Sequence, residues 1–232
     1  MKIFKKIFLI FISSFSFISP VFSQTVFEGF YGQVLTGYEK NTVGHSSPTV
    51  TGNGINYSGT STGDGISNSA PLVFGAGYTF NINTQFNIGL GFDFYALQQN
   101  TGDVYSNFGS QGGGIGNTSY HYRISNRYNI FLMPGINIGK DKVAYFKGGY
   151  SNETISALGN IDTNNQHVDG YVIGLGYKQI ITDGLYGLIE ANYFNYGKGT
   201  LSAPVSNGSA SYYPNMGTPS AFNILIGLGY KF

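Results

Sequence analysis

The chain has 232 residues, of which 10% are charged and 16% aromatic, with 35 glycines, no cysteine and a formal net charge of +1. The absence of cysteine excludes disulfides, cysteine-ligated zinc and a thiolate nucleophile, and the near-zero charge gives no general attraction to nucleic acid. Few charges together with abundant glycine are untypical of a disordered chain or a helical bundle.

Residues 1–23 have the pattern of a secretory signal peptide. Three lysines precede an apolar run over residues 7–18, and small or apolar residues surround a predicted cleavage site after Ser23. A membrane-anchoring helix needs about 20 apolar residues, and this run is shorter. Cleavage would leave residues 24–232 as one domain with 9 basic and 11 acidic residues. The mature chain has no apolar run long enough for a spanning helix, so a closed β-barrel is its remaining route across a membrane.

Eight segments of the mature chain alternate apolar residues with polar or small ones at a period of two, which predicts strands. The last segment is the clearest. From Phe222 onward every second residue reads Phe, Ile, Ile, Leu, Tyr, Phe, while the opposite face carries Asn, Leu, Gly, Gly, Lys. The predicted strands are 27–38, 72–80, 86–94, 120–138, 143–152, 170–180, 185–196 and 222–232.

Long and short connections alternate between these strands. The long ones are rich in Gly, Asn, Ser and Thr and are predicted to be polar loops, whereas the short ones are turns. An even number of antiparallel strands with short turns on one side and long loops on the other is the layout of an outer-membrane barrel. The predicted loops are 39–68, 98–119, 153–169 and 197–219, and the predicted turns are 81–85, 139–142 and 182–184.

The predicted fold is therefore all-β, an eight-stranded antiparallel up-and-down transmembrane β-barrel in the outer membrane of a Gram-negative bacterium. A soluble barrel with an apolar interior is also possible on the alternation alone. The signal peptide, the terminal Phe232 and the unequal connections favour the membrane. Aromatic residues near strand ends are expected to anchor at the membrane interfaces: Tyr31, Tyr38, Tyr78, Phe80, Phe94, Tyr120, Tyr122, Tyr128, Tyr150, Tyr177, Tyr193, Tyr196 and Phe232.

Several glycine and aromatic segments resemble the Opa-like/Omp25-type family of small, porin-like outer-membrane β-barrels. They are FEGFYG at 27–32, YFKGGY at 145–150, GYVIGLG at 170–176, ITDG at 181–184 and EANY at 190–193. The resemblance covers nearly the whole mature chain and implies an architecture without catalytic residues.

The chain ends in Gly-Tyr-Lys-Phe, which looks like the C-terminal aromatic ending of that family. The resemblance implies that Tyr230 and Phe232 form the assembly signal that the barrel-assembly machinery reads during insertion. The chain departs from the family at Lys178, where an acidic residue is usual.

Charged residues on the predicted lumen faces are the candidate site. Lys178 and Glu190 are expected nearly opposite each other on neighbouring strands, and Asp93 beside the arginines of the next strand. We interpret them as a network of salt bridges that stiffens a lumen wide enough only for side chains. Alternatively, lumen glycines leave space for a narrow ion-conducting pore. The lumen set is Asp93, Arg123, Arg127, Lys147, Lys178, Glu190 and Lys231.

His121 with Ser125 and a carboxylate is the group that most resembles catalytic machinery. Residues four apart on a strand are about 13 Å apart, too far for a hydroxyl to reach its base. The predicted function is a non-enzymatic outer-membrane protein with a structural envelope role and surface loops for adhesion or interaction. The alternatives are a small porin and a lipid-modifying enzyme. No cofactor, metal or nucleic acid is expected, and the partners are outer-membrane lipids, the assembly machinery and an unknown extracellular ligand.

Overall fold

The computed structural model describes residues 27–45, 47–52, 55–63, 65–107, 117–204 and 211–232. The predicted signal peptide lies outside these ranges. No helix in the described ranges is long and apolar enough to cross a membrane.

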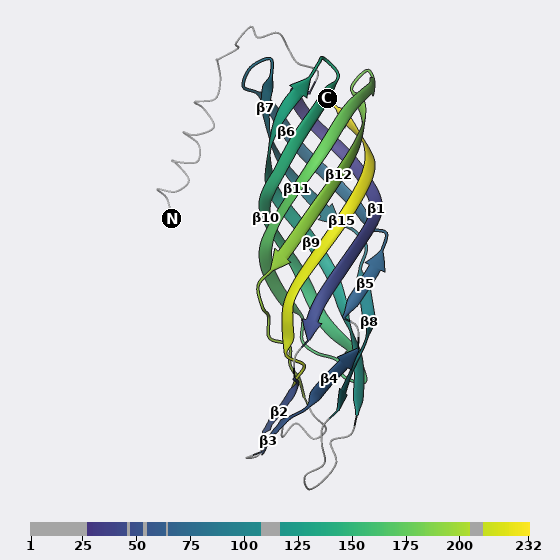
Figure 1. The fold of residues 1–232 in the computed structure, drawn as a ribbon, viewed down its shortest axis with the longest axis vertical. Helices are drawn as coiled ribbons and strands as arrows, with labels where there is room; N and C mark the ends of the chain where they lie inside the picture. Colours follow the sequence, from purple (N-terminus) through teal and green to yellow (C-terminus); the bar gives the residue numbers. More distant parts are fainter. Residues whose placement is uncertain (1–26, 46, 53–54, 64, 108–116, 205–210) are drawn as a thin grey trace, which may run out of the picture.

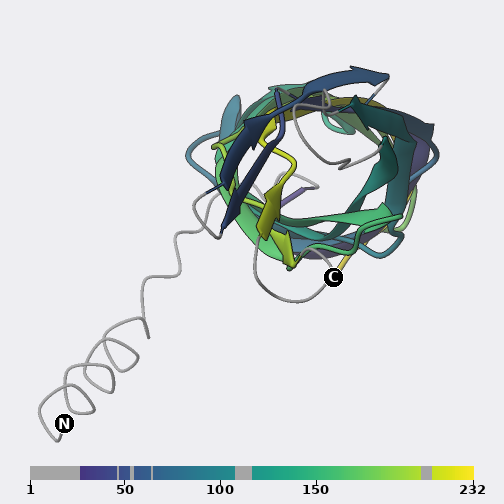
Figure 2. The same ribbon diagram turned by 90° about the horizontal axis from the view of Figure 1, so that it is seen from below.

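Eight long antiparallel strands form a closed ring, as Figures 1 and 2 show. Each strand pairs with its neighbours in chain order, and β15 pairs with β1 to close the ring. The predicted fold class is confirmed. The ring strands are β1 (Gly29–His45), β6 (Leu72–Asn81), β7 (Phe86–Tyr95), β9 (Thr118–Ile138), β10 (Lys142–Gly159), β11 (Gln166–Thr182), β12 (Leu185–Tyr196) and β15 (Met216–Lys231).

The short turns between β6 and β7, β9 and β10, and β11 and β12 lie at the same end of the barrel as the C-terminus (Figure 1). Gly139 and Gly184 have positive φ values of 72° and 87°, a backbone conformation that glycine adopts without a steric penalty. Tight turns at this end and long connections at the other identify it as the periplasmic end of an outer-membrane barrel.

The period of two sends apolar side chains outward and polar ones inward. On β15, Ile224, Ile226 and Leu228 are 44–59% exposed, whereas Asn223 between the outward residues is fully buried. A belt of exposed apolar residues of this kind surrounds the ring, and aromatic side chains mark its extracellular border. Tyr38, Tyr128, Tyr150, Tyr171 and Tyr193 form this outer aromatic ring.

Four of the expected interface anchors point inward instead. They lie in the interior because the parity of their strands places them on the lumen face, where they fill space left by small residues. Tyr31, for example, occupies the space beside Gly77 and Gly91. The buried four are Tyr31, Tyr120, Tyr122 and Tyr196.

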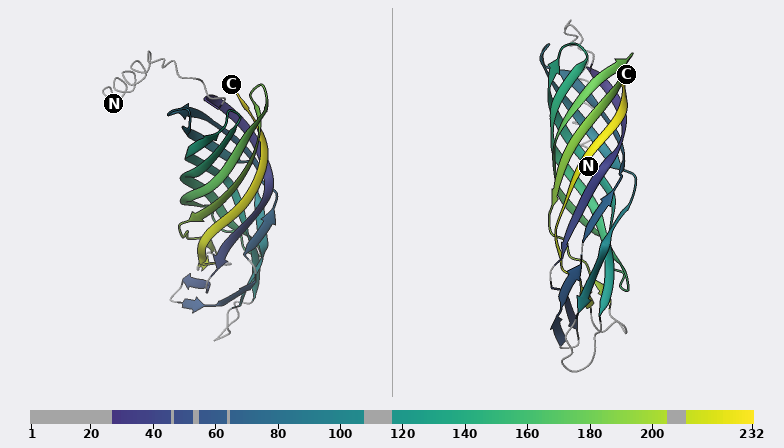
Figure 3. Two further views of the ribbon diagram at one scale, coloured as in Figure 1. Left: turned by 45° about the horizontal axis from the view of Figure 1, so that its top comes forward. Right: turned by 45° about the vertical axis from the view of Figure 1, so that its right-hand side comes forward.

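The strands continue far beyond the predicted barrel, into segments expected to be loops. β1 runs to His45, β10 to Gly159, and β15 begins at Met216. Polar composition hid these extensions, because polar residues occupy most of their outward positions and also some of the inward ones, Glu39, Asn41 and Glu153 among them. Figure 3 shows that the added strands project beyond the ring at the extracellular end.

The connections add seven short strands. Four of them form a separate small sheet in the order β13-β14-β2-β3, and the others extend the main sheet through pairs β5 with β1, β8 with β9 and β4 with β8. Their bounds are β2 (Thr49–Gly52), β3 (Ile55–Ser58), β4 (Thr60–Gly63), β5 (Ile66–Ser69), β8 (Gln99–Asn107), β13 (Ala203–Pro204) and β14 (Ser211–Tyr213).

A β-bulge on β9 changes which set of alternate residues points into the lumen. Asn152 of β10 pairs with Tyr128 and Thr154 with Ser125, so Asn126 and Arg127 together face the single residue Glu153. Asn126 has a φ of 51°, a left-handed conformation that asparagine tolerates better than most residues. Even-numbered side chains of β9 therefore point inward before Asn126, and odd-numbered ones point inward after it.

Candidate functional site

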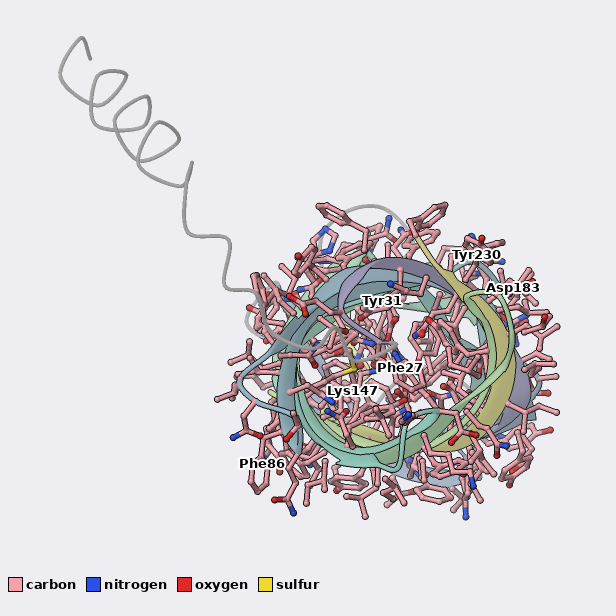
Figure 4. All side chains as sticks on the ribbon, turned by 90° about the horizontal axis from the view of Figure 1, so that it is seen from above. Phe27, Tyr31, Phe86, Lys147, Asp183 and Tyr230 are labelled. Atoms are coloured by element: carbon pink, nitrogen blue, oxygen red, sulfur yellow. The ribbon has the colours of Figure 1, made fainter. Side chains whose placement is uncertain are left out.

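The middle of the lumen holds a buried cluster of three charged side chains from three strands. Lys147 of β10 donates to Asp93 Oδ2 of β7 at 2.5 Å and to Glu190 Oε1 of β12 at 2.8 Å. All three are at most 2% exposed, and Figure 4 shows Lys147 inside the ring. Tyr145 and Asn192 also donate to Glu190, at 2.7 and 2.8 Å. A buried ion pair needs such additional hydrogen bonds to offset desolvation.

Lys178 lies toward the periplasmic end, in a cage of tyrosines. Its Nζ is 4.2 Å from the ring centre of Tyr31 and 5.2 Å from those of Tyr145 and Tyr186. Its partners are therefore ring faces, which attract cations. The expected pairing with Glu190 is absent, because the turn shifts the register and places Lys178 opposite Leu188.

A second buried ionic cluster lies at the level of the outer aromatic ring. Arg127 contacts Glu39 at 2.8 Å and Glu153 at 2.7 Å, and all three side chains are nearly inaccessible. The Arg127 guanidinium lies 5.0–5.9 Å from the ring centres of Tyr95, Phe194 and Tyr196. One cation thus holds two carboxylates while packing against aromatic faces.

Buried amides connect the two ionic clusters. Asn192 donates to Glu190 and, at 2.9 Å, to Asn223. Asn223 donates in turn to Glu39 at 2.8 Å. Gln99 of β8 also donates to Glu39, at 2.7 Å. The lumen therefore carries one continuous hydrogen-bonded network over much of its length, and side chains fill it.

Above the network, apolar side chains close the extracellular end. Tyr120 packs edge-on against Tyr122 and against Tyr212, with ring centres 5.5 and 6.3 Å apart. Strand extensions and connections both contribute, so the connections fold over the barrel and form a small core with it. The residues of this extracellular core, each at most 5% exposed, are Val43, Val50, Val104, Tyr120, Tyr122, Ile155, Ala157, Leu201, Ala203, Tyr212 and Met216.

The periplasmic end contains a small pocket. Its volume is about 20 Å³, which is enough for about one water molecule. Phe27, Met133 and Lys178 are among its lining residues, and Figure 4 shows Phe27 inside the ring at this end. The pocket is therefore a narrow vestibule in front of the filled lumen.

Of the predicted lumen residues, Asp93, Lys147 and Glu190 come together in one cluster, whereas Arg127 and Lys178 lie in other layers. Asp93 meets Lys147 instead of an arginine, because the residue opposite it on β9 is Asn129.

Two predicted lumen residues are placed differently. Arg123 faces outward and is half-buried, because it precedes the Asn126 bulge that reverses the parity of β9. Lys231 is half-buried at the periplasmic rim, beside Gly29.

Sequence reasoning missed Glu39 and Glu153, which fell in predicted loops. Extending the alternation outward from Gly37 and Ser151 would have placed both on the lumen face.

The histidine group does not assemble into catalytic machinery. His121 lies 3.8 Å from the exposed Asp103, but Ser125 is four residues further along β9, about 13 Å at the usual strand rise. His167 contacts the hydroxyl of Thr154 at 3.0 Å. The described residues contain no group of three or more side chains that could hold a metal ion.

The resemblance of this chain to known proteins is structural. No family model and no curated protein matches the chain. OprG of Pseudomonas aeruginosa is 14% identical over 88% of this chain and 96% of its own, with a TM-score of 0.55. Neisserial surface protein A is 12% identical over 88% and 98%, with a TM-score of 0.45. The protease OmpT of Escherichia coli is 11% identical over 92% and 99%, with a TM-score of 0.47.

The closed ring, the apolar outer belt and the likeness to OprG define the fold of a bacterial outer-membrane β-barrel. The protein is accordingly an outer-membrane protein, located in that membrane with its short turns toward the periplasm. It is a small, eight-stranded member of this general class.

Proposed function

We propose that this protein is a non-enzymatic barrel of the Opa-like/Omp25 type that supports the envelope and presents an extracellular surface for adhesion. The observation that carries the proposal is the filled interior. An ionic network occupies the lumen and an apolar core covers its extracellular end. Charged and hydrogen-bonded side chains held this tightly stiffen a barrel and leave little space for solute.

The extracellular strands support the adhesive part of the proposal. They extend the barrel beyond the outer aromatic ring as ordered β-structure, and their outward face is polar. Thr51, Asn56 and Ser58 are exposed on the β2–β3 hairpin. A preorganised surface binds a partner with less loss of conformational entropy than a flexible loop does.

The adhesive role is tested with whole cells. We expect cells that express the protein to adhere to immobilised extracellular-matrix protein, or to one another, more than cells of a deletion strain. The triple substitution T51E/N56E/S58E should abolish the difference, whereas T84E/Q85E, in the exposed periplasmic turn, should preserve it. Equal adhesion with and without the protein would contradict the proposal.

The closed interior is tested separately. The purified barrel in planar bilayers should show no conductance steps, and liposomes that contain it should not swell in sugar solution. Reproducible single-channel steps would mean that the ionic network opens, and would favour the small-porin alternative. A changed lipid A profile on deletion would instead favour an enzyme.

A further inference from the structure

The outer wall of the barrel carries an apolar groove of about 800 Å³ across β7, β9, β10 and β11. Cross-strand pairing explains its shape. Phe86 pairs with Ile136, which pairs on its other side with Ala144. Phe146, two residues beyond Ala144 on the same face, pairs with Leu175. The short side chain of Ala144 therefore lies among long ones.

The groove is apolar and open to the outside. Leu175 and Ile82 are 66% and 62% exposed, and Phe86 is 43% exposed. Figure 4 shows Phe86 on the outside of the ring. The volume is in the range of pockets that hold small-molecule ligands. Its position within the apolar belt makes a hydrocarbon chain the occupant that fits its walls.

The periplasmic end of this groove is positively charged. Lys142 lies two residues before Ala144 on the same outward face, about 7 Å along the strand. Lys140 is exposed in the adjoining turn. Asp141 lies between them, so the turn carries a net charge of +1. A basic pair at the edge of an apolar groove fits an anionic headgroup joined to an acyl chain.

A second outer groove provides a contrast. It has a volume of about 500 Å³ and crosses β1, β6, β7 and β9, with Ala76 and Leu90 among its lining residues. At the periplasmic end of β1 and β6 stands Glu28, which accepts a hydrogen bond from Asn81 at 2.8 Å. Lys231 lies beside Gly29 at the same end, so Glu28 and Lys231 balance each other there. The two grooves thus share apolar walls and differ in the net charge nearby.

We propose that the groove beside Ala144 is a binding site for an anionic glycerophospholipid of the periplasmic leaflet. The phosphate lies at Lys140 and Lys142, and one acyl chain follows the wall past Ala144 between Phe86 and Phe146. The second groove lacks this net positive charge, and it takes acyl chains without selecting their headgroup.

Native mass spectrometry of the refolded barrel, titrated with phosphatidylglycerol, phosphatidylcholine or lipid A, tests the proposal. One phosphatidylglycerol should remain bound at concentrations at which phosphatidylcholine and lipid A have dissociated. K140Q and K142Q should each weaken it about fivefold, because a lysine near an anionic headgroup contributes about 1 kcal/mol. A144F should displace the lipid by filling the groove.

Two variants serve as matched controls. K40Q removes an exposed lysine at the extracellular side, and A76F fills the other groove, so both should retain phosphatidylglycerol. Heat-modifiable gel mobility confirms that every variant is folded. Equal retention of the three lipids by the wild-type barrel, a preference for lipid A, or loss of phosphatidylglycerol in A76F as complete as in A144F would overturn the proposal.

Discussion

Removing the cation of the central cluster should destabilise the barrel strongly. In Lys147→Met an unbranched apolar side chain, shorter by one atom, replaces the lysine, and Asp93 and Glu190 lose their ion pairs inside a fully buried site. Asp93 is affected most, because Lys147 is its hydrogen-bond partner at Oδ2 and its Oδ1 has none. Leaving a buried charge without its partner costs about 3–5 kcal/mol, and we expect a loss of that size in the free energy of unfolding.

The cost arises from charge imbalance and can be reversed. Lys147→Met/Asp93→Asn leaves Glu190 with its hydrogen bonds from Tyr145 and Asn192. The positive charge of the nearby Lys178 then balances that of Glu190, so the net buried charge returns to zero. Most of the lost stability should return in this double variant, since neutralising both members of a buried pair is often nearly neutral. Lys40→Met removes an exposed lysine instead and should change the free energy by less than about 0.5 kcal/mol.

Urea unfolding in phospholipid vesicles, followed by circular dichroism and by heat-modifiable gel mobility, measures these changes. A loss for Lys147→Met no larger than that for Lys40→Met would refute the reasoning, because it would mean that water solvates the cluster. A double variant as unstable as the single one would show that volume, and not charge, sets the cost.

The remaining predictions concern the bulge, the extracellular surface and the closing strand. Asn126→Val should cost about 1–2 kcal/mol in urea unfolding because it forces a β-branched residue into a left-handed conformation, whereas Asn126→Gly should be nearly neutral. The exposed Asp169 has a pKa below its ordinary value because Tyr150 and Asn152 donate to its carboxylate. Its small contribution to stability is therefore present above the unfolded pKa and lost as the pH falls through the folded one. In a carboxyl NMR titration, Tyr150→Phe should raise that pKa, and an unchanged value would contradict the assignment. Deleting Phe232, which is 76% exposed and whose backbone N–H donates to Phe30 at 2.9 Å, should lower the amount of protein in outer-membrane fractions severalfold. Undiminished levels would count against a role for this residue in assembly.

Much of the architecture could be read from the sequence, because a barrel strand in a membrane has two simple requirements. One face must be apolar and the other polar or small, and the segment must be about ten residues long. Phe222 to Phe232 satisfies both, and its observed pairing with β1 and β12 follows from chain order in an up-and-down barrel. Asp93, Lys147 and Glu190 were found for the same reason, since parity alone places them in the lumen.

The sequence could not show which charges meet. Lys178 and Glu190 are close in the chain but separated by the register of their turn, and Lys147 reaches Glu190 across the lumen from a strand that is not its neighbour in the ring. Such cross-lumen contacts depend on the diameter and stagger of the barrel, which are properties of the closed ring as a whole.

The sequence by itself determined that the chain forms an eight-stranded outer-membrane barrel with a polar interior, because the period-two pattern acts locally along each strand. Only the tertiary structure decided which side chains fill the interior and how they meet. A single bulge at Asn126 turned Arg123 outward, and the polar connections folded back to bury an apolar core above the charges. Both are consequences of how distant strands pair, and no local pattern encodes them.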